Sequence, residues 1–232
     1  MTDLSEQLDL LYFVASRLGD LNERVVYLGG CAVGLVIDNA DVPQVRPTRD
    51  VDVIVEVLGR GEYYALEEAL RQRGFTHDIE GPICRWRVDE VIVDVMPDDE
   101  AILGFSNRWY GMAIRTAEPR RLRDLTIRVV TPPLLLATKM AAFRSRGGGD
   151  YLASHDLEDL LAVIEGRPSI VRDCFEAPQE VRAYLGAEFS ELLADSDFIN
   201  ALPGLSALQV GGAGSADALL ERVRNLANTL AR

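Results

Sequence analysis

The sequence predicts an α+β protein, in which a mixed β-sheet with flanking helices is followed by a helical C-terminal region. Residues 25–57 read as strand, glycine turn, helix, loop and strand, and residues 83–96 contain two alternating apolar runs around a tight turn. Beyond residue 131 the apolar positions recur at helical spacing. We therefore expect a core domain over residues 1–130 and a helical region over residues 131–232.

The composition is that of a globular chain. It has 232 residues, of which 48% are hydrophobic, enough to bury a sizeable core. No apolar run approaches the ~20 residues that cross a bilayer, and the first residues lack a basic stretch before an apolar one. We therefore expect a cytoplasmic protein with no membrane partner. Cys31, Cys84 and Cys174 form no CxxC pattern, so we expect small buried side chains rather than disulfides or a zinc site.

The charge is strongly acidic but uneven along the chain. A net charge of −13 argues against a general nucleic-acid coating protein. Basic residues nevertheless gather between Arg108 and Arg146, where Glu118 and Asp124 are the acids that oppose them. Two interpretations of this basic stretch stay open, namely a local anion-binding face and a solvated basic edge of the sheet.

The first half of the predicted core alternates helices and strands. An amphipathic helix is expected over about Leu4–Leu18, and a short apolar strand over Val25–Leu28 ends at the Gly29-Gly30 turn. A helix over Cys31–Ile37 follows. The proline-broken segment Asn39–Thr48 then predicts a loop before the next strand.

Two carboxylates open that next strand, which runs from Asp50 to Val57. With the two-residue period of a strand, Val51 and Val53 point to one face while Asp50 and Asp52 point to the other. Neighbouring side chains on one face of a strand are about 6–7 Å apart, so both carboxylates could reach the same cation.

A crossover helix and a hairpin are expected next. The helix over Gly61–Gly74 carries Tyr64, Leu66, Ala69 and Leu70 at helical spacing, and the hairpin joins Ile83–Val88 to Val91–Met96 through Asp89-Glu90. In its second strand Asp94 lies in mid-strand, opposite in direction to Val93 and Val95. A buried carboxylate is costly unless it is paired or bound to metal, so Asp94 is a third candidate ligand. The alternative is a surface-facing or salt-bridged Asp94.

The region from residue 125 onward contains one further strand and then helices. After a strand over Leu125–Val130, Thr131 and the following prolines predict the start of a helix that runs to Arg144. This helix contains Lys139, the only lysine among the 24 basic residues. A lysine supplies a compact point charge that suits a triphosphate, whereas the alternative is an unremarkable position on an exposed helix face.

A glycine connector, Gly147–Gly149, precedes another helix start at Ser154–Asp159. Capping alone could account for Asp156, Glu158 and Asp159 in a first helical turn, and His155 reads as a helix-start residue. The chain closes with a glycine-rich loop, Gly211–Ser215, and an amphipathic helix whose apolar positions are Leu219, Val223, Leu226 and Leu230.

These candidates together suit chemistry at phosphorus. A glycine turn before a helix exposes N–H groups to phosphate oxygens. Asp50, Asp52 and Asp94 could hold two divalent cations about 3.5–4 Å apart, the arrangement for in-line displacement. The competing dinucleotide-binding motif is disfavoured, because residues 29–34 do not read GxGxxG and two acids begin the strand instead of one ending it.

The same residues resemble a known superfamily. Gly29-Gly30, Asp50-Val51-Asp52 and Asp94 look like the signature of the nucleotidyltransferase superfamily that includes DNA polymerase β. The segment from Arg46 to Asp52 resembles the Arg-x-Thr/Ser-x-Asp-x-Asp form of the AbiEii-type toxin nucleotidyltransferases of prokaryotic toxin-antitoxin and phage-defence systems. Residues 136–144 and 156–160 resemble the lysine, arginine and Asp-x-x-Asp motif of that group. Two departures are the long interval between the glycines and Asp50, and Gly30 in place of the common serine.

The resemblance implies a nucleotidyltransferase-like fold whose helical region completes the active site, and an NMP transfer from an NTP to an acceptor hydroxyl. It implies two Mg²⁺ ions, with Mn²⁺ as a substitute, and metal ligands at Asp50, Asp52 and Asp94. It also implies catalytic roles for those acids and for Lys139 and Asp156, and nucleotide contacts from Gly29, Gly30, Arg46, Thr48, Lys139 and Arg144.

The acceptor is the least defined part of this expectation. The toxin resemblance points to tRNA 3′ ends and to a cognate antitoxin partner, and the basic stretch would suit RNA. The acidic chain would equally suit a small basic molecule or a protein hydroxyl as acceptor. A third alternative is an interaction protein that keeps the fold without the activity.

Overall fold

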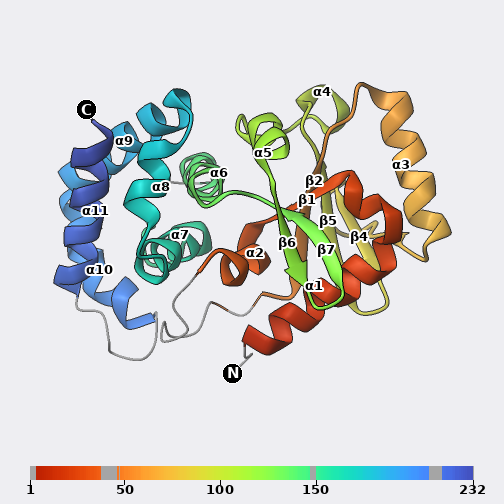
Figure 1. Ribbon diagram of the computed structural model, residues 1–232, viewed down its shortest axis with the longest axis horizontal. Coiled ribbons are helices and arrows are strands. Elements are labelled where there is room, and N and C mark those ends of the chain that lie inside the picture. Colours follow the sequence, from red (N-terminus) through yellow and green to blue (C-terminus); the bar gives the residue numbers. More distant parts are fainter. Residues whose placement is uncertain (1–3, 38–45, 47, 147–149, 209–215, 232) are drawn as a thin grey trace. The chain divides into compact units, whose positions relative to one another are not determined.

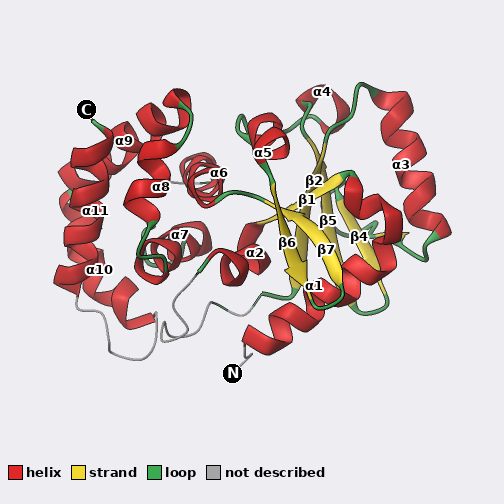
Figure 2. Cartoon of the chain, in the orientation of Figure 1, coloured by secondary structure: helices red, strands yellow, loops and turns green. Residues whose placement is uncertain are grey.

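The computed structural model describes residues 4–37, 46, 48–146, 150–208 and 216–231. The chain divides into two compact units, which we name the sheet unit (Met1–Leu35 and Pro47–Thr131) and the helical unit (Val36–Arg46 and Pro132–Arg232). Figure 2 shows strands in the sheet unit and helices in both. The predicted α+β class, a mixed sheet with flanking helices and C-terminal helices, is confirmed.

The sheet unit is built on one mixed sheet (Figure 1). Its described strands follow the order β3-β4-β5-β2-β1-β7-β6, in which β2 is parallel to β5 and β1 is parallel to β7, while the other pairs are antiparallel. The acid-bearing strand therefore lies in the interior of the sheet. The strands are β1 (Val25–Leu28), β2 (Asp50–Val55), β3 (Thr76–His77), β4 (Arg85–Val88), β5 (Val91–Pro97), β6 (Glu118–Leu122) and β7 (Leu125–Val129).

Helices connect these strands. The predicted helix at the start of the chain is confirmed with the expected bounds, and it packs against β7, β2 and β5. The glycine pair, expected as a turn ahead of a helix, instead forms the first turn of α2 itself. The helices that begin in this unit are α1 (Leu4–Leu18), the 3-10 helix η1 (Gly19–Glu23), α2 (Gly29–Val36), α3 (Arg60–Gln72), α4 (Glu100–Leu103) and α5 (Tyr110–Thr116).

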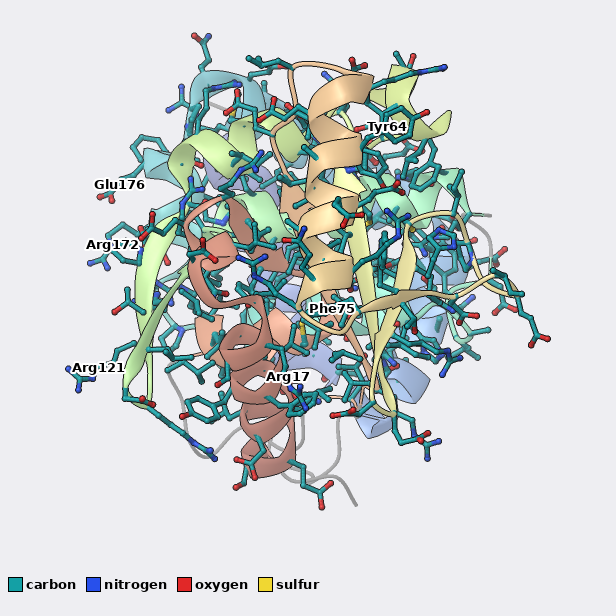
Figure 3. The ribbon with its side chains drawn as sticks, turned by 90° about the vertical axis from the view of Figure 1, so that its right-hand side faces the viewer. Arg17, Tyr64, Phe75, Arg121, Arg172 and Glu176 are labelled. Atoms are coloured by element: carbon teal, nitrogen blue, oxygen red, sulfur yellow. The ribbon has the colours of Figure 1, made fainter. Side chains whose placement is uncertain are left out.

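The predicted crossover helix α3 is confirmed, but the prediction that Tyr64 lies on its apolar face is wrong. Tyr63, Leu66 and Leu70 are buried, whereas Tyr64 is 62% exposed. Figure 3 labels Tyr64 on this helix. Adjacent tyrosines cannot share one face of a helix, and Tyr63 lies three residues before Leu66, so it completes the apolar stripe.

The predicted hairpin is also confirmed. Val88 pairs with Val91, so Asp89 and Glu90 form a two-residue turn, in which Asp89 adopts a positive φ of 50°. The sequence reasoning missed β3, β6, α4 and α5. Strand β6 carries Arg120 and Arg121 at the edge of the sheet, where arginines discourage pairing with another chain.

The helical unit packs around α6, which contacts α7, α8 and α9. Residues Leu134–Ala137 and Met140 of α6 are fully buried. Helix α11 lies beside α9, as Figure 1 shows, and its predicted apolar positions are buried. The helices are α6 (Pro132–Ser145), α7 (His155–Gly166), α8 (Ile170–Glu176), α9 (Gln179–Ala194), α10 (Ser196–Leu208) and α11 (Ala216–Leu230).

The structure also bears on the predictions for the cysteines and the loops. All three cysteines are buried and free, as predicted. Most of the loop expected over Asn39–Thr48, the glycine connector at 147–149 and the glycine-rich loop at 211–215 lie outside the described residues. Among the residues that are described, no helix is long and apolar enough to cross a membrane.

Candidate active-site residues

The two acids of β2 lie at the start of this interior strand and share one face. Val51 and Val53 on the opposite face are fully buried, whereas Asp50 and Asp52 are half-buried. The hydroxyl of Thr48 donates a hydrogen bond to Asp50 Oδ1. Thr48 therefore orients the first carboxylate of the pair.

Asp94 lies beside the second of these acids. In the parallel pairing of β2 with β5, Asp52 is the direct partner of Asp94. Directly paired residues of neighbouring strands project to the same face of a sheet. The sheet therefore brings Asp50, Asp52 and Asp94 to one face.

The Asp52 carboxylate lies against Gly29. Gly29 has a φ of +74°, and a Cβ added to it would lie 2.6 Å from Asp52 Cγ, inside contact distance. Only glycine meets both conditions without strain. Since Gly29 begins α2, the carboxylate lies at the positive end of this helix, where an anion is stabilised. Gly30 follows in the same first turn.

Arg85 is the residue of this site that the sequence reasoning missed. Its Nε donates to Asp94 Oδ1 at 2.9 Å and its Nη2 donates to Asp94 Oδ2 at 2.8 Å, a two-pronged contact with both carboxylate oxygens. The hydrogen bond to Asp94 is the largest influence raising the pKa of Arg85, and the charges of Asp94 and Asp50 add to it. The sequence could have predicted this contact, because a two-residue turn at Asp89-Glu90 places Arg85 directly opposite Asp94.

The charges of Asp94 and Asp52 affect the pKa of the nearby Cys84 thiol. Burial is the main reason that the pKa of this thiol rises to about 11, and the charges of Asp94 and Asp52 raise it further. Cys84 is 5% exposed, and its thiol stays protonated at neutral pH. Cys84 is therefore a protonated thiol beside the acid cluster.

The carboxylates of this site are the residues that could hold a divalent cation. Within the described residues, no three His, Cys, Asp or Glu side chains are grouped so that they could hold a metal ion. Asp50 and Asp52 supply two carboxylates on one face, which suits a hard cation such as Mg²⁺. Asp94 is engaged by Arg85 at both oxygens and would have to leave it to bind a cation.

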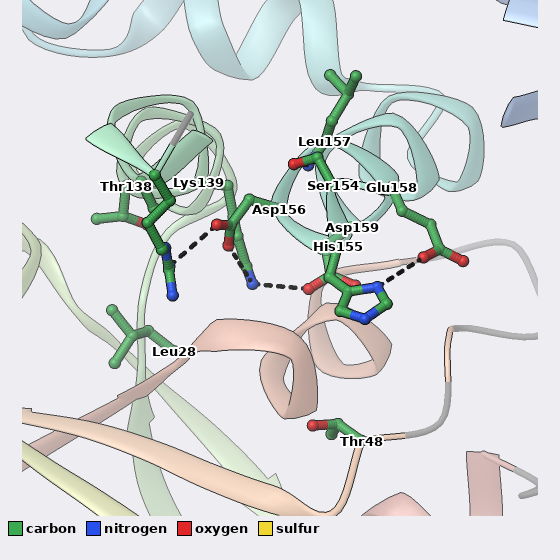
Figure 4. A network of polar contacts seen from close by, with 12 residues as sticks. Leu28, Thr48, Thr138, Lys139, Ser154, His155, Asp156, Leu157, Glu158 and Asp159 are labelled. Atoms are coloured by element: carbon green, nitrogen blue, oxygen red, sulfur yellow. Dashed lines mark hydrogen bonds and ion pairs between the residues drawn. The ribbon is translucent and has the colours of Figure 1, made fainter. Parts of the chain in front are cut away.

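A second polar cluster lies in the helical unit, where α6 faces α7 (Figure 4). Lys139 Nζ lies 3.2 Å from Asp156 Oδ1 and 2.7 Å from Asp159 Oδ2. The side chain of Asp159 is 1% exposed and that of Lys139 is 11% exposed. The lone lysine is thus a buried cation held by two carboxylates, not a residue of an exposed helix face.

Arginines complete this cluster. Arg146 Nη2 lies 3.0 Å from Asp156 Oδ2, and Arg46 Nε lies 3.5 Å from Asp159 Oδ1 and 3.9 Å from Glu158 Oε2. Three cations therefore oppose three carboxylates. Ser154 caps α7 by accepting a hydrogen bond from the Leu157 N–H, and Asp156 contacts cations from its place in the first turn.

Arg144, predicted to contact nucleotide, is engaged elsewhere in the helical unit. Its Nε donates to Glu188 at 2.7 Å, and its Nη2 lies 3.2 Å from Glu191. Other members of the basic stretch are paired too, since Arg120 binds Glu118 and Arg123 binds Asp9. Five of the nine basic residues of this stretch therefore contact acids, namely Arg120, Arg123, Lys139, Arg144 and Arg146.

Comparisons with known proteins support the fold. No protein-family model matches the chain, and no curated protein sequence matches it significantly. Among solved structures, the fold is similar to that of an antigenic nucleotidyltransferase-like protein from Paracoccidioides brasiliensis. The match has a TM-score of 0.51 at 17% identity and covers 85% of this chain and 92% of that protein. The likeness is one of fold and extends over both units.

Proposed function

We propose that this protein is a nucleotidyltransferase that moves an NMP group from an NTP to an acceptor hydroxyl with the help of Mg²⁺. The observation that carries the proposal is the pairing of Asp52 with Asp94 across two parallel strands. Asp50, two residues before Asp52, shares the same face of the sheet, and Asp52 lies beside Gly29 at the N-terminus of α2. The likeness of the fold to a nucleotidyltransferase-like protein supports the general kind of enzyme.

The sheet unit supplies the acids for this reaction. Asp50 and Asp52 would hold the cation, and Thr48 orients Asp50 for that role. When bound, Mg²⁺ neutralises charge on the triphosphate and polarises the reacting phosphoryl group. Asp94 is proposed to orient the acceptor hydroxyl and take its proton as the oxygen attacks the α-phosphorus and pyrophosphate leaves. The Arg85 fork fixes the orientation of Asp94.

Lys139, in the helical unit, is the phosphate contact that the resemblance to the nucleotidyltransferase superfamily implies, and we propose it for that role. A lysine ammonium is a flexible point charge with three donors, so it can bind a phosphate oxygen while a carboxylate still holds it. Asp156 and Asp159 position this ammonium, and Arg46 contacts Asp159. We therefore assign Asp156 and Arg46 as positioning residues, while Arg144 contacts Glu188 instead of serving the nucleotide.

The acceptor is proposed as a class rather than a molecule. The resemblance of Arg46–Asp52 to toxin nucleotidyltransferases favours an RNA 3′ end such as that of tRNA, with an antitoxin as protein partner. The pairing of Arg120, Arg123 and Arg144 with acids favours the alternative, a small molecule or protein hydroxyl, because paired arginines offer less to an RNA backbone.

The test is direct. The protein is incubated with each of the four α-labelled NTPs, Mg²⁺ and a whole-cell extract, after which RNA, protein and small molecules are separated and counted. We expect label in one fraction with wild-type protein and a loss of at least about 10³-fold with Asp50→Asn, since the variant lacks a charge needed in the transition state.

Asp89→Asn is the matched control, because it makes the same chemical change at an exposed hairpin turn of the same unit, where Asp89 pairs with Arg17. It should transfer label as wild type does. Equal transfer by folded Asp50→Asn would reject the proposed roles. A calorimetric titration without any binding of Mg²⁺-NTP would instead favour an interaction protein that keeps only the fold.

A further inference from the structure

Gly81 lies against the side chain that holds Asp94. It belongs to the loop of residues 78–84 between β3 and β4. A Cβ added to Gly81 would lie 2.7 Å from Arg85 Cδ and 3.3 Å from Arg85 Cβ. Carbon atoms that are not bonded to each other pack about 3.5–4.0 Å apart. A side chain at position 81 would therefore displace the stem of Arg85.

The backbone does not account for this glycine. Gly29 adopts a positive φ of 74°, a conformation that other residues rarely take. Gly81 does not have a positive φ, so its φ is one that other residues adopt. What glycine supplies at position 81 is space beside Arg85.

Arg85 has little freedom to give way. Its backbone pairs directly with Asp94 across β4 and β5, and its N–H donates to the Pro82 carbonyl at 2.8 Å. Its guanidinium donates to both oxygens of Asp94, at 2.9 and 2.8 Å. A stem fixed at both ends can move only if one of these contacts is lost. Because the backbone end belongs to the sheet, we expect the contact with the Asp94 carboxylate to be the one that is lost.

The loop has little freedom to move away from Arg85 either. The Gly81 N–H donates to the Asp78 carbonyl at 3.2 Å, which closes a tight turn, and the Glu80 N–H donates to Asp78 Oδ1 at 3.3 Å. The other oxygen of Asp78, Oδ2, accepts a hydrogen bond from Arg87 Nε on β4 at 2.9 Å. Asp78 therefore holds the turn, and Gly81 with it, against β4.

We propose that Gly81 is a positioning residue of the proposed active site. By leaving room for the Arg85 stem, it allows the guanidinium to hold Asp94 in the orientation in which the carboxylate takes the proton of the acceptor hydroxyl. This inference rests on the proposed function and adds a residue on which its proton transfer depends. The effect of Gly81 passes through Arg85.

The first measurement needs no nucleotide. Hydrogen exchange of arginine Nε–H groups is followed by ¹⁵N NMR on the full chain, and Arg85→Lys identifies the Arg85 signal by its loss. In wild type this proton should exchange more slowly than that of the exposed Arg172, because Asp94 accepts it. Gly81→Ala should speed its exchange at least about tenfold, since the hydrogen bond opens.

The second measurement is transfer of labelled NMP to the fraction that wild type modifies. Gly81→Ala should lower kcat at least about tenfold and leave the KM for the NTP unchanged, because Asp94 is proposed to act on the acceptor and not on the nucleotide. In an Arg85→Ala chain, adding Gly81→Ala should lower kcat less than about twofold further, since the stem that meets the added Cβ is already absent.

Gly61→Ala is the matched control, because it makes the same change in the same unit where an added Cβ meets nothing within 4 Å. It should keep both the slow exchange and the wild-type kcat. Thermal unfolding of each variant verifies that it is folded.

The proposal is overturned if folded Gly81→Ala keeps the wild-type exchange of the Arg85 Nε–H, or if Gly81→Ala lowers kcat equally with and without the Arg85 side chain. If Gly81→Ala does not fold, the double variant with Arg85→Ala should fold, and its failure to do so would also overturn the proposal. Failure of the proposed function is a separate result, seen as wild-type protein that transfers no label while its Arg85 Nε–H still exchanges slowly.

Discussion

Asp52 on β2 and Asp94 on β5 are direct partners across two parallel strands, and one arginine, Arg85, contacts the second of them. Two carboxylates so close favour a bound cation. We predict that Mg²⁺ at ten times its Kd stabilises the protein by about 1.4 kcal/mol, a rise of about 3–5 °C in Tm, and that Asp52→Asn abolishes this rise. Asp124→Asn, at the exposed turn between β6 and β7, should keep it. Differential scanning fluorimetry with and without Mg²⁺ measures the shift.

Much of this acid cluster follows from local sequence rules. The two-residue period of a strand places Asp50 and Asp52 on one face, and the Asp89-Glu90 turn defines the hairpin register. The parallel pairing of Asp52 with Asp94 could not be predicted, because strand order depends on contacts distant in sequence. The contact of Arg85 with Asp94 is different, because the hairpin register alone places these two residues opposite each other.

Gly29 should tolerate no side chain. Its φ of +74° is costly for alanine, and the added Cβ would overlap the Asp52 carboxylate. We predict that Gly29→Ala lowers the free energy of unfolding by at least about 2 kcal/mol and weakens Mg²⁺ binding, because Asp52 must move. Urea unfolding and Mn²⁺ titration give the two values.

Gly61→Ala is the matched control for that change. Gly61 lies in the first turn of α3, and a Cβ added there meets nothing within 4 Å. Alanine should stabilise this helix by up to about 1 kcal/mol and leave Mn²⁺ binding unchanged. A Gly29→Ala protein as stable as wild type would contradict the close approach of Asp52 to the start of α2.

Lys139 and Asp159 should depend on each other for stability. Lys139→Met keeps the apolar stem but leaves a 1% exposed carboxylate without its nearest cation, so we predict a loss of about 3 kcal/mol. Asp159→Asn in the same chain should recover at least about 1 kcal/mol of this loss. Urea unfolding of both single variants and the double variant measures the coupling, and additive losses would mean that the two groups do not interact.

This cluster also marks a limit of what the sequence could predict. Lys139 is the only lysine of the chain, which indicated a functional role. Helix capping was a sufficient explanation of Asp156 and Asp159. What the sequence did not reveal is that Ser154 does the capping while both acids contact Lys139. That distinction depends on how α6 packs against α7, which is a tertiary contact that the pattern of neither helix encodes.

Tyr151 makes the stability of the protein sensitive to alkaline pH. Burial, aided by its hydrogen bond to Asp195 at 2.6 Å, raises the pKa of Tyr151 to about 12, against about 10 in an unfolded chain. A raised folded-state pKa contributes stability that is complete below pH 10 and is lost as the pH rises towards 12. Removing the phenol should therefore matter less at high pH.

At pH 8, Tyr151→Phe should cost about 1 kcal/mol, because it deletes the hydrogen bond to Asp195. At pH 11 the wild type has itself lost about 1.4 kcal/mol through ionisation of the unfolded tyrosine, so the two proteins should be nearly equal in stability. Comparing the variant with wild type cancels the contributions of the other tyrosines. Urea unfolding at both pH values measures the difference, and a gap that widens at pH 11 would show that the Tyr151 phenol ionises more readily in the folded chain.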